Sequence, residues 1–281
     1  CDTLRPVYDA TEGADGFVSL EVSPHLAHDT HGTVEQARHL WRSVHRDNLM
    51  VKVPATEPGL EAIEVLIAEG INVNVTLLFS VDRYEQVHAA YTRGLGQNER
   101  PREVASVASF FVSRVDGMID PKLDALEEDT AELRSRAAIA NARTAYQSFL
   151  RLRQEPDFTA QARRGARVQR PLWASTSTKD PSLPDTWYVD NLIGPDTVNT
   201  VPPKTLDAWV EHGAAYETLT DDPDQDRAVL LALGDRGIDL KAVTDHLEAD
   251  GVQKFKDSHD ALVEALHAKL TEVSARYASS L

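Results

Sequence analysis

A lysine inside an apolar run is the most informative candidate for chemistry in this chain. Lys52 lies within Leu49-Met50-Val51-Lys52-Val53-Pro54, a pattern typical of a buried strand that ends at a proline. Because successive side chains of a strand point to opposite faces, Lys52 points away from its apolar neighbours. Burial favours the neutral form of an amine, which can attack a carbonyl group. The pattern predicts either a Schiff-base nucleophile or a strand lysine that reaches the rim or pairs with a glutamate.

A glutamate lies in a similar run one predicted strand earlier. Glu21 follows Val18-Ser19-Leu20 and precedes Val22. Formation and hydrolysis of an imine require proton transfer, which a carboxylate near Lys52 could perform through a water molecule. The alternatives are a structural ion pair with Lys52 or a strand residue that faces solvent.

Two polar residues alternate in the next predicted strand. Asn74 and Thr76 are two positions apart in Asn72-Val73-Asn74-Val75-Thr76-Leu77-Leu78, so their side chains share a face. An amide can bind a sugar hydroxyl, and a threonine hydroxyl can hold a catalytic water. Ordinary residues on the polar face of a strand would show the same pattern.

Two later segments could bind phosphate. Ser109 and Arg114 stand at the end of a further predicted strand, where a guanidinium can hold phosphate in a bidentate manner. Ser175 and Lys179, in the segment 173–179, form a second possible phosphate cradle, because phosphate sites of TIM barrels often use the loops after late strands. A surface salt bridge is the alternative for Arg114.

Three histidines, together with Asp29, are candidate metal ligands. His25, His28 and His31 follow an i, i+3, i+6 spacing, which spreads the side chains around a helix instead of converging them. No cysteine and no HExxH motif accompanies them. We therefore predict histidines of a solvated loop, and no metal site.

Short β-rich runs alternate with longer helical patterns along the chain, and this order implies parallel strands joined by helical crossovers. We expect strands over residues 16–22, 49–54, 71–78, 104–112, 172–176 and 197–201. We expect helices over residues 33–46, 58–69, 81–94 and 121–155, the last either continuous or broken, and an amphipathic helix at about 252–277.

The arrangement favours an α/β fold of the (β/α)8 TIM-barrel type. The chain contains neither a GxGxxG motif after the first strand nor a GxxxxGK[ST] motif, and its polar residues cluster within or just after strands, where such barrels collect their chemistry. Only six strands are counted, and residues 4–8 resemble the end of an element already under way. We therefore expect one domain over residues 1–281 that is truncated at its N-terminus.

Composition excludes several classes of partner. The 281 residues are 42% hydrophobic and 26% charged, and their net charge of −16 argues against binding to nucleic acid. No apolar run approaches the ~20 residues that cross a membrane. A single cysteine, Cys1, fits a reducing compartment, so we expect a cytoplasmic protein. A phosphorylated substrate would need a few well-placed cations.

Taken together, these segments resemble the transaldolases, particularly a longer actinobacterial type, over nearly the whole chain. The resemblance rests on the order and spacing of VSLEVSPHLAHDT, MVKVPATEPGLEAI, INVNVTLLFS, ASFFVSRVDGMID, RPLWASTSTKDP and GPDTVNTVPPKT. It implies a barrel with class I aldolase chemistry that works without a metal or an organic cofactor. The implied partners are sugar phosphates, and the protein could be a homodimer or a monomer.

The resemblance also implies roles for the candidate residues. Lys52 matches the Schiff-base lysine, and Glu21 and Thr76 match the carboxylate and the threonine that act with a catalytic water. The matching substrate contacts are Asn74 for the sugar, Ser109 for the substrate, and Arg114 and Ser175 for phosphate. The family's Ala-Ser-x-Arg segment is Ala-Ser-Thr-Ser here, which leaves Lys179 as a substitute for the arginine.

The implied reaction moves dihydroxyacetone from a ketose phosphate, such as sedoheptulose 7-phosphate or fructose 6-phosphate, to glyceraldehyde 3-phosphate or erythrose 4-phosphate, in the non-oxidative pentose phosphate pathway. The family's acid/base aspartate, on its first strand, has no match in this sequence. We therefore expect little transferase activity from these 281 residues alone. The alternatives are a fructose 6-phosphate aldolase-like lyase and a non-catalytic fragment that binds sugar phosphates.

Overall fold

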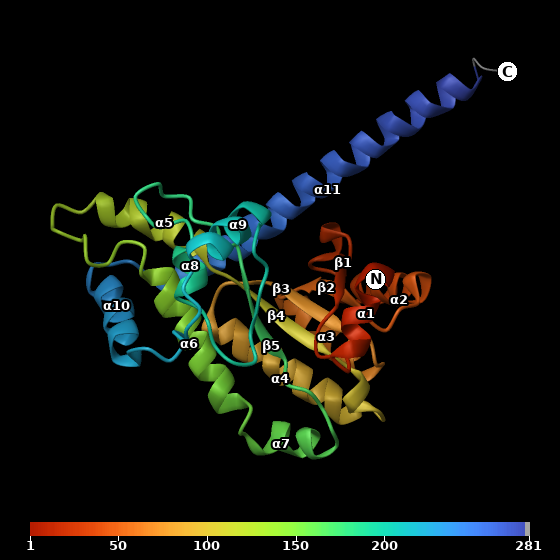
Figure 1. The fold of residues 1–281 in the computed structure, drawn as a ribbon, viewed down its shortest axis with the longest axis horizontal. Coiled ribbons are helices and arrows are strands. Elements are labelled where there is room, and N and C mark those ends of the chain that lie inside the picture. The colour runs from red at the N-terminus through yellow and green to blue at the C-terminus, as the bar shows by residue number, and fades with distance from the viewer. Residues whose placement is uncertain (279–281) are drawn as a thin grey trace.

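Six parallel strands form the centre of the molecule, in a computed structural model that describes the backbone of residues 1–278 and the side chains of residues 1–273 (Figure 1). They are paired in the order of the sequence, and each predicted strand is present. The strands are β1 (Val18–Glu21), β2 (Leu49–Pro54), β3 (Val73–Leu78), β4 (Ser106–Phe111), β5 (Arg170–Ala174) and β6 (Val198–Asn199). The α/β prediction is confirmed, with a curled half-barrel of six strands.

Helical crossovers connect the strands, as the alternating pattern predicts. Three of them begin at a side-chain cap, in which Asp29, Thr56 and Ser80 each accept a hydrogen bond from a backbone amide of the first turn. These helices are α2 (Thr30–Val44), α3 (Glu57–Ala68) and α4 (Val81–Gln97). They follow β1, β2 and β3 respectively, and they lie against one side of the sheet (Figure 1).

The predicted helical stretch over residues 121–155 is broken. It comprises the end of α5 (Ser113–Asp124) and α6 (Ala137–Leu152), which are separated by a loop. Pro121 lies inside α5 and lacks the amide that would continue the hydrogen-bond ladder, and α5 ends three residues later. Within the loop, Ser135 adopts a left-handed φ of 56° and donates hydrogen bonds from its amide and hydroxyl to Asp120.

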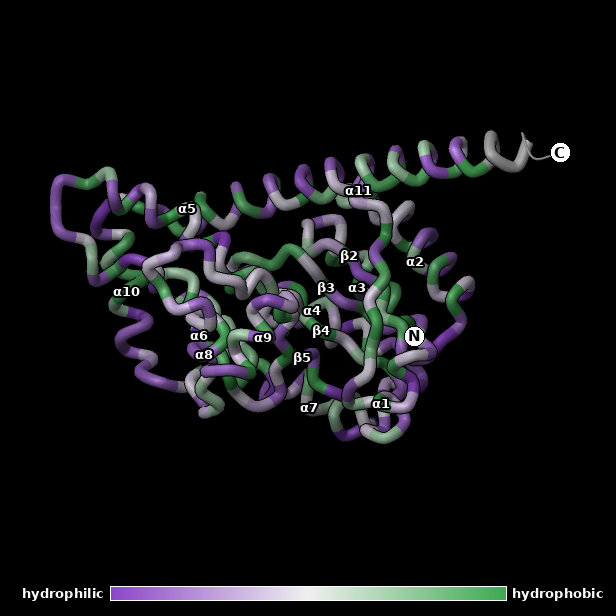
Figure 2. The backbone as a smooth tube through the Cα atoms, turned by 45° about the horizontal axis from the view of Figure 1, so that its top comes forward, coloured by the Kyte–Doolittle hydropathy of each residue, from purple (hydrophilic) through white to green (hydrophobic). Residues whose placement is uncertain are grey.

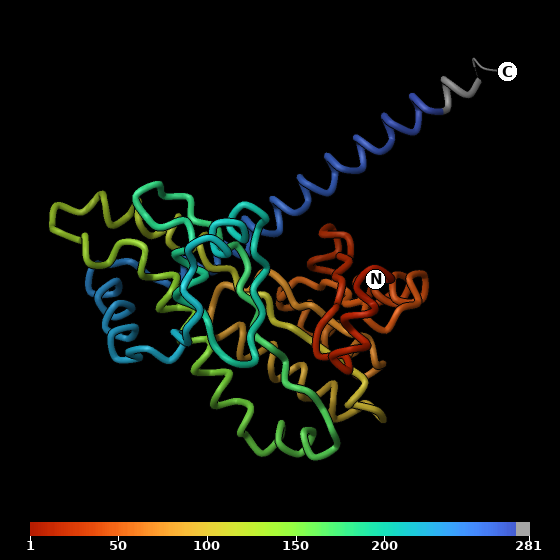
Figure 3. The backbone as a smooth tube through the Cα atoms, viewed as in Figure 1, coloured from red at the N-terminus to blue at the C-terminus, as the bar shows by residue number. Residues whose placement is uncertain are grey.

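Several short elements complete the chain, as the backbone trace in Figure 3 shows. All of these elements are helical, and the periodicity of the sequence predicted none of them. They are η1 (Asp2–Leu4), α1 (Arg5–Ala10), η2 (Pro24–Leu26), η3 (Pro101–Glu103), α7 (Pro156–Arg163), α8 (Trp187–Asp190), α9 (Pro203–His212) and α10 (Pro223–Asp235).

The C-terminal helix, α11 (Leu240–Ala278), begins twelve residues before its predicted start. It contacts α5, η2 and β3, and it then projects beyond the body of the molecule (Figures 1 and 2). Phe255 packs edge-to-face with Phe111, whereas the rest of the predicted apolar side is exposed in the described part of the helix: Leu262, Leu266, Leu270 and Val273. No helix in the described range combines the length and the apolar character that a membrane span requires.

Candidate functional site

The register of the sheet brings three of the predicted site residues side by side. Glu21 of β1 pairs with Lys52 of β2, and Lys52 pairs with Asn74 of β3. Paired residues of parallel strands point to the same face of the sheet. This is the concave face, since Asn74, Met50 and Ser19 line the cavity inside the half-barrel. The side chain of Lys52 therefore points into the interior, as its alternation with Val51 and Val53 predicts.

The amine of Lys52 forms an ion pair with the carboxylate of Glu21. Their side chains are 22% and 44% exposed, so neither charge is fully withdrawn from water. The ring of Phe255, from α11, lies over the amine, with its centroid 5.5 Å from Nζ. This geometry is compatible with a structural ion pair and with a Schiff-base nucleophile. The carboxylate of Glu21 is the ion-pair partner of Lys52, and it is also the nearest acceptor for a proton of the ammonium.

Thr76 lies two positions beyond Asn74 on the same strand and is 2% exposed. Its hydroxyl has no hydrogen-bond partner among the described residues. Together with Lys52, Glu21 and Phe255, it lines a space of only about 10 Å³. A single water needs roughly 10–15 Å³, so this space is close to the size of one water molecule.

The backbone of β3 is irregular directly after Thr76. Leu77 has a left-handed φ of 63°, a conformation that non-glycine residues rarely adopt, and the pairing with β4 shifts register between Val75 and Leu78. The helix α11 closes over this point, because a side chain added at Gly251 would come within 2.9 Å of Leu77. Strained backbone of this kind clusters at functional sites, and it was not predictable from an apolar pair of leucines.

The amide of Asn74 connects three strands across the interior face. It donates to the hydroxyl of Ser19 at 2.9 Å and accepts a hydrogen bond from Ser109 at 2.6 Å. Asn74 and Ser109 are 5% and 2% exposed. The sequence analysis singled out Asn74 and Ser109 but missed Ser19. Ser19 lies two residues before Glu21 in β1, so the period of a strand places both side chains on the same face.

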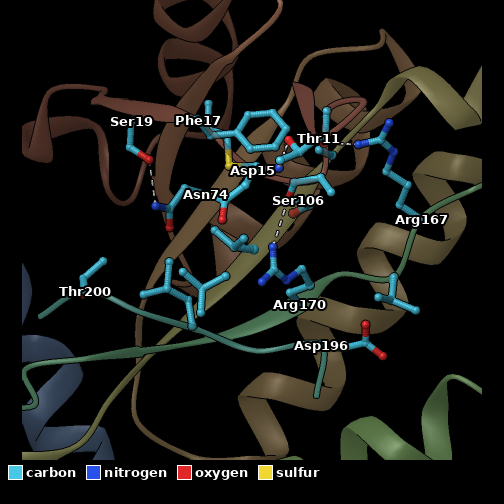
Figure 4. A pocket seen from close by; sticks show the side chains of 18 residues that line it. Thr11, Asp15, Phe17, Ser19, Asn74, Ser106, Arg167, Arg170, Asp196 and Thr200 are labelled. Atoms are coloured by element: carbon cyan, nitrogen blue, oxygen red, sulfur yellow. Dashed lines mark hydrogen bonds between the residues drawn. The ribbon is translucent and has the colours of Figure 1, made fainter. Parts of the chain in front are cut away.

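A cavity of about 600 Å³ opens beside this amide, between β1 and β6 (Figure 4). Its walls include Asn74, Ser19, Arg170 and Thr200. Lys52 does not line it. The larger space and the small space at the amine are therefore distinct in this structure.

Arg114 lies in the first turn of α5, after the carboxyl end of β4. One terminal nitrogen, Nη1, is buried and has no partner among the described residues, and the guanidinium lies 5.2 Å from the ring centroid of Phe111. Next to it in sequence, the hydroxyl of Ser113 lies 3.0 Å from that of Ser175. Ser175 follows β5 with a left-handed φ of 57°. The structure thus brings the segments of Arg114 and Ser175 together.

The remaining candidates are not part of this arrangement. Lys179 is exposed and forms no ion pair within the described part of the chain. Asp29 caps α2, and His28 and His31 are exposed. His25 instead contacts Asp260 of α11, at 2.7 Å.

Asp116 is a buried carboxylate that the sequence analysis did not single out, and it lies two residues after Arg114 in α5. Asp116 is 2% exposed, accepts hydrogen bonds from the amide of Ala138 and the hydroxyl of Tyr188, and has Asp120 nearby. Burial raises its pKa to about 7, against the opposing effect of the two hydrogen bonds. It anchors α6 and α8 to α5.

Comparisons with known proteins identify the relatives of this chain. Residues 1–266 match the family described as Transaldolase/Fructose-6-phosphate aldolase. A transaldolase of Parafrankia is 52% identical over 276 residues, which cover 96% of this chain and 75% of the relative. A transaldolase of Acidothermus cellulolyticus is 51% identical, over 96% of this chain and 74% of the relative. Transaldolase 2 of Nostoc is 44% identical, over 98% and 76% respectively.

The chain thus spans about three quarters of the length of these relatives. The family match extends over both the strands that carry Lys52, Glu21 and Thr76 and the helices that cover them. This chain belongs to the transaldolase family.

Proposed function

We propose that this protein transfers a dihydroxyacetone unit from a ketose phosphate to an aldose phosphate through a Schiff base on Lys52. The observation that carries the proposal is the position of the Lys52 amine. It lies on the interior face, in contact with the carboxylate of Glu21 and beside the unpaired hydroxyl of Thr76.

The first step needs a neutral amine. Glu21 is positioned to take a proton from the Lys52 ammonium, directly or through a water. The freed amine attacks the keto carbon of the sugar, and the carbonyl oxygen leaves as water after it is protonated. The hydroxyl of Thr76 and the space of about 10 Å³ beside it suit the water that carries these protons.

Cleavage of the bond between C3 and C4 follows from the imine. The electron pair of that bond moves into the imine and gives an enamine, while the C4 hydroxyl loses its proton to a base and the aldose departs. The enamine carbon then attacks the acceptor aldehyde, and hydrolysis frees Lys52. The resemblance assigns the base to an aspartate in a segment that this chain does not match, so we assign only the imine steps to residues of this chain.

The phosphate of the substrate is proposed to bind Arg114. Its buried, unpaired Nη1 provides a donor, and the N-terminus of α5 and the Ser113–Ser175 pair add polar groups nearby. Lys179 is proposed only as a secondary contact, because its side chain is exposed.

Trapping of the imine tests the proposal. Borohydride reduction in the presence of fructose 6-phosphate should attach one sugar adduct to Lys52, as located by peptide mass spectrometry. From this chain we expect the uncleaved six-carbon sugar phosphate, because the three-carbon adduct requires the base that cleaves the bond between C3 and C4. Lys52→Ala should abolish the adduct, whereas Lys122→Ala, which removes an exposed lysine of α5, should leave it unchanged. An adduct that persists in Lys52→Ala would refute the assignment. An active full-length relative in which the lysine equivalent to Lys52 stays unmodified would refute the mechanism.

The second candidate function is that of a lyase that releases free dihydroxyacetone. The matched family includes fructose 6-phosphate aldolase as well as transaldolase, and this supports the second candidate. Turnover measured with and without an aldehyde acceptor separates the two reactions, because a transaldolase depends on the acceptor. A non-catalytic sugar-phosphate-binding protein would bind fructose 6-phosphate but give no adduct.

A further inference from the structure

Two histidines and an aspartate from distant parts of the chain meet at the edge of the site. His25 belongs to η2, directly after β1, and His259 and Asp260 belong to α11. His25 and Asp260 are 235 positions apart in the sequence. The spacing that argues against a metal site involves His25, His28 and His31, and it includes neither His259 nor Asp260.

The donor atoms converge. Asp260 Oδ1 lies 2.7 Å from His25 Nε2 and 3.4 Å from His259 Nδ1, and the donor atoms of the three residues all lie within 4.8 Å of one another. Ligands at about 2.05 Å around a tetrahedral ion are separated by about 3.3 Å. Small side-chain rotations are therefore enough to place all three atoms around one cation.

The chemistry of the group selects the kind of cation. Two imidazoles and one carboxylate suit Zn²⁺ and similar first-row ions, whereas Ca²⁺ and Mg²⁺ prefer oxygen ligands. All three side chains are between 39% and 55% exposed, which gives an ion access and lets water complete its coordination.

We propose that His25, His259 and Asp260 bind a zinc-class divalent cation, and that the bound ion fastens α11 to η2. Both elements contribute to the cover of the amine. Pro24, next to His25, and Phe255, one helical turn before His259, line the small space at Lys52. A metal that joins these elements holds Phe255 over the amine, and it should therefore slow entry of a sugar phosphate. This last consequence rests on the proposed function, whereas the binding of the ion does not.

Zinc titration by isothermal calorimetry tests the site. The thiol of Cys1 is a competing zinc ligand, so Cys1→Ser is the background for every variant. We expect one zinc per chain, and a loss of affinity of ~30-fold or more in His25→Ala and in Asp260→Asn. His39→Ala removes an exposed histidine of α2 and should bind as the background does. Equal affinity in His25→Ala and His39→Ala, or no binding at about 1 mM zinc, would overturn the proposal.

Amide hydrogen exchange provides the second readout. Zinc should slow exchange in residues 252–260 of the background protein and leave the His25→Ala variant unchanged; equal effects in the two would overturn the proposed link between α11 and η2. Lys52→Ala should bind zinc with undiminished affinity. If that variant binds zinc while the background forms no sugar adduct, the metal site stands and the proposed function fails.

Discussion

The central strands of the sheet and its edge strand β1 hold their site residues in different surroundings. Every residue of β3 and β4 is buried, whereas Ser19, Leu20 and Glu21 of β1 are exposed. Asn74, Thr76 and Ser109 are consequently fixed by packing on both sides, while Glu21 reaches Lys52 from a strand with one open edge. The central strands therefore supply rigidity, and β1 supplies a proton acceptor at little gain in stability.

Truncation of one large side chain in a central strand and of one in β1 should give the largest difference in the free energy of unfolding. Phe110→Ala in β4 removes a ring that is 1% exposed and packs against Trp173, so we expect a loss of about 3–5 kcal/mol in the free energy of unfolding. Leu20→Ala in β1 removes a side chain from a residue that is 40% exposed and should cost less than about 1 kcal/mol. Urea unfolding measures both values. Similar losses would show that β1 is as tightly packed as β4.

Asp116 sharpens the comparison, because the buried side of the molecule also holds a carboxyl group that titrates near neutral pH. The pKa of Asp116 is raised from 3.8 to about 7, so its stabilising contribution is complete below pH 3.8 and is lost as the pH rises to about 7. Within this window the slope approaches about 1.4 kcal/mol per pH unit. Asp116→Asn should flatten that decline in a series of urea titrations.

The control for this experiment is Asp124→Asn, which alters an exposed carboxylate of the same helix. It should leave the pH dependence between pH 4 and 7 as in the parent protein. If the stability of the parent protein relative to Asp116→Asn rises through this window, the assigned sign is wrong.

Glu21→Gln should have the smallest effect on stability. The ion pair with Lys52 is partly exposed, so its loss should change the free energy of unfolding by less than about 1 kcal/mol. The rate of sugar adduct formation should nevertheless fall by ~10²-fold, because the amine loses its nearest proton acceptor. Glu69→Gln removes another partly exposed ion pair, with Arg38, and should leave the adduct rate unchanged. Equal adduct rates in the two variants would make Glu21 a structural partner only.

Much of the fold followed from local patterns. The apolar run around Lys52 and the alternation of Asn74 with Thr76 predicted strands and the faces of their side chains, because the period of a strand is two residues. The helices that begin after Asp29, Thr56 and Ser80 carried both caps and apolar periodicity. α9 and α10 escaped prediction because their apolar residues do not form one buried stripe. Leu206, Val210 and Leu231 are exposed, and the buried residues are Thr205 in α9 and Val229 and Leu233 in α10.

Contacts between distant segments could not be predicted in the same way. Ser19, Asn74 and Ser109 share one hydrogen-bonded group only because three strands curl around a common interior. Likewise, nothing near Val252 in the sequence indicates that Phe255 will cover Lys52, since that contact depends on where α11 crosses the sheet.

By itself, the sequence determined the strands, the order of the crossovers and the residue types available for Schiff-base chemistry, because these depend on short-range periodicity and side-chain identity. The tertiary structure decided which of those residues meet. Sheet register set Glu21 against Lys52, and the path of α11 set Phe255 over the amine and Asp260 against His25. Such contacts join residues far apart in the chain, and only the packing of whole elements fixes their distances.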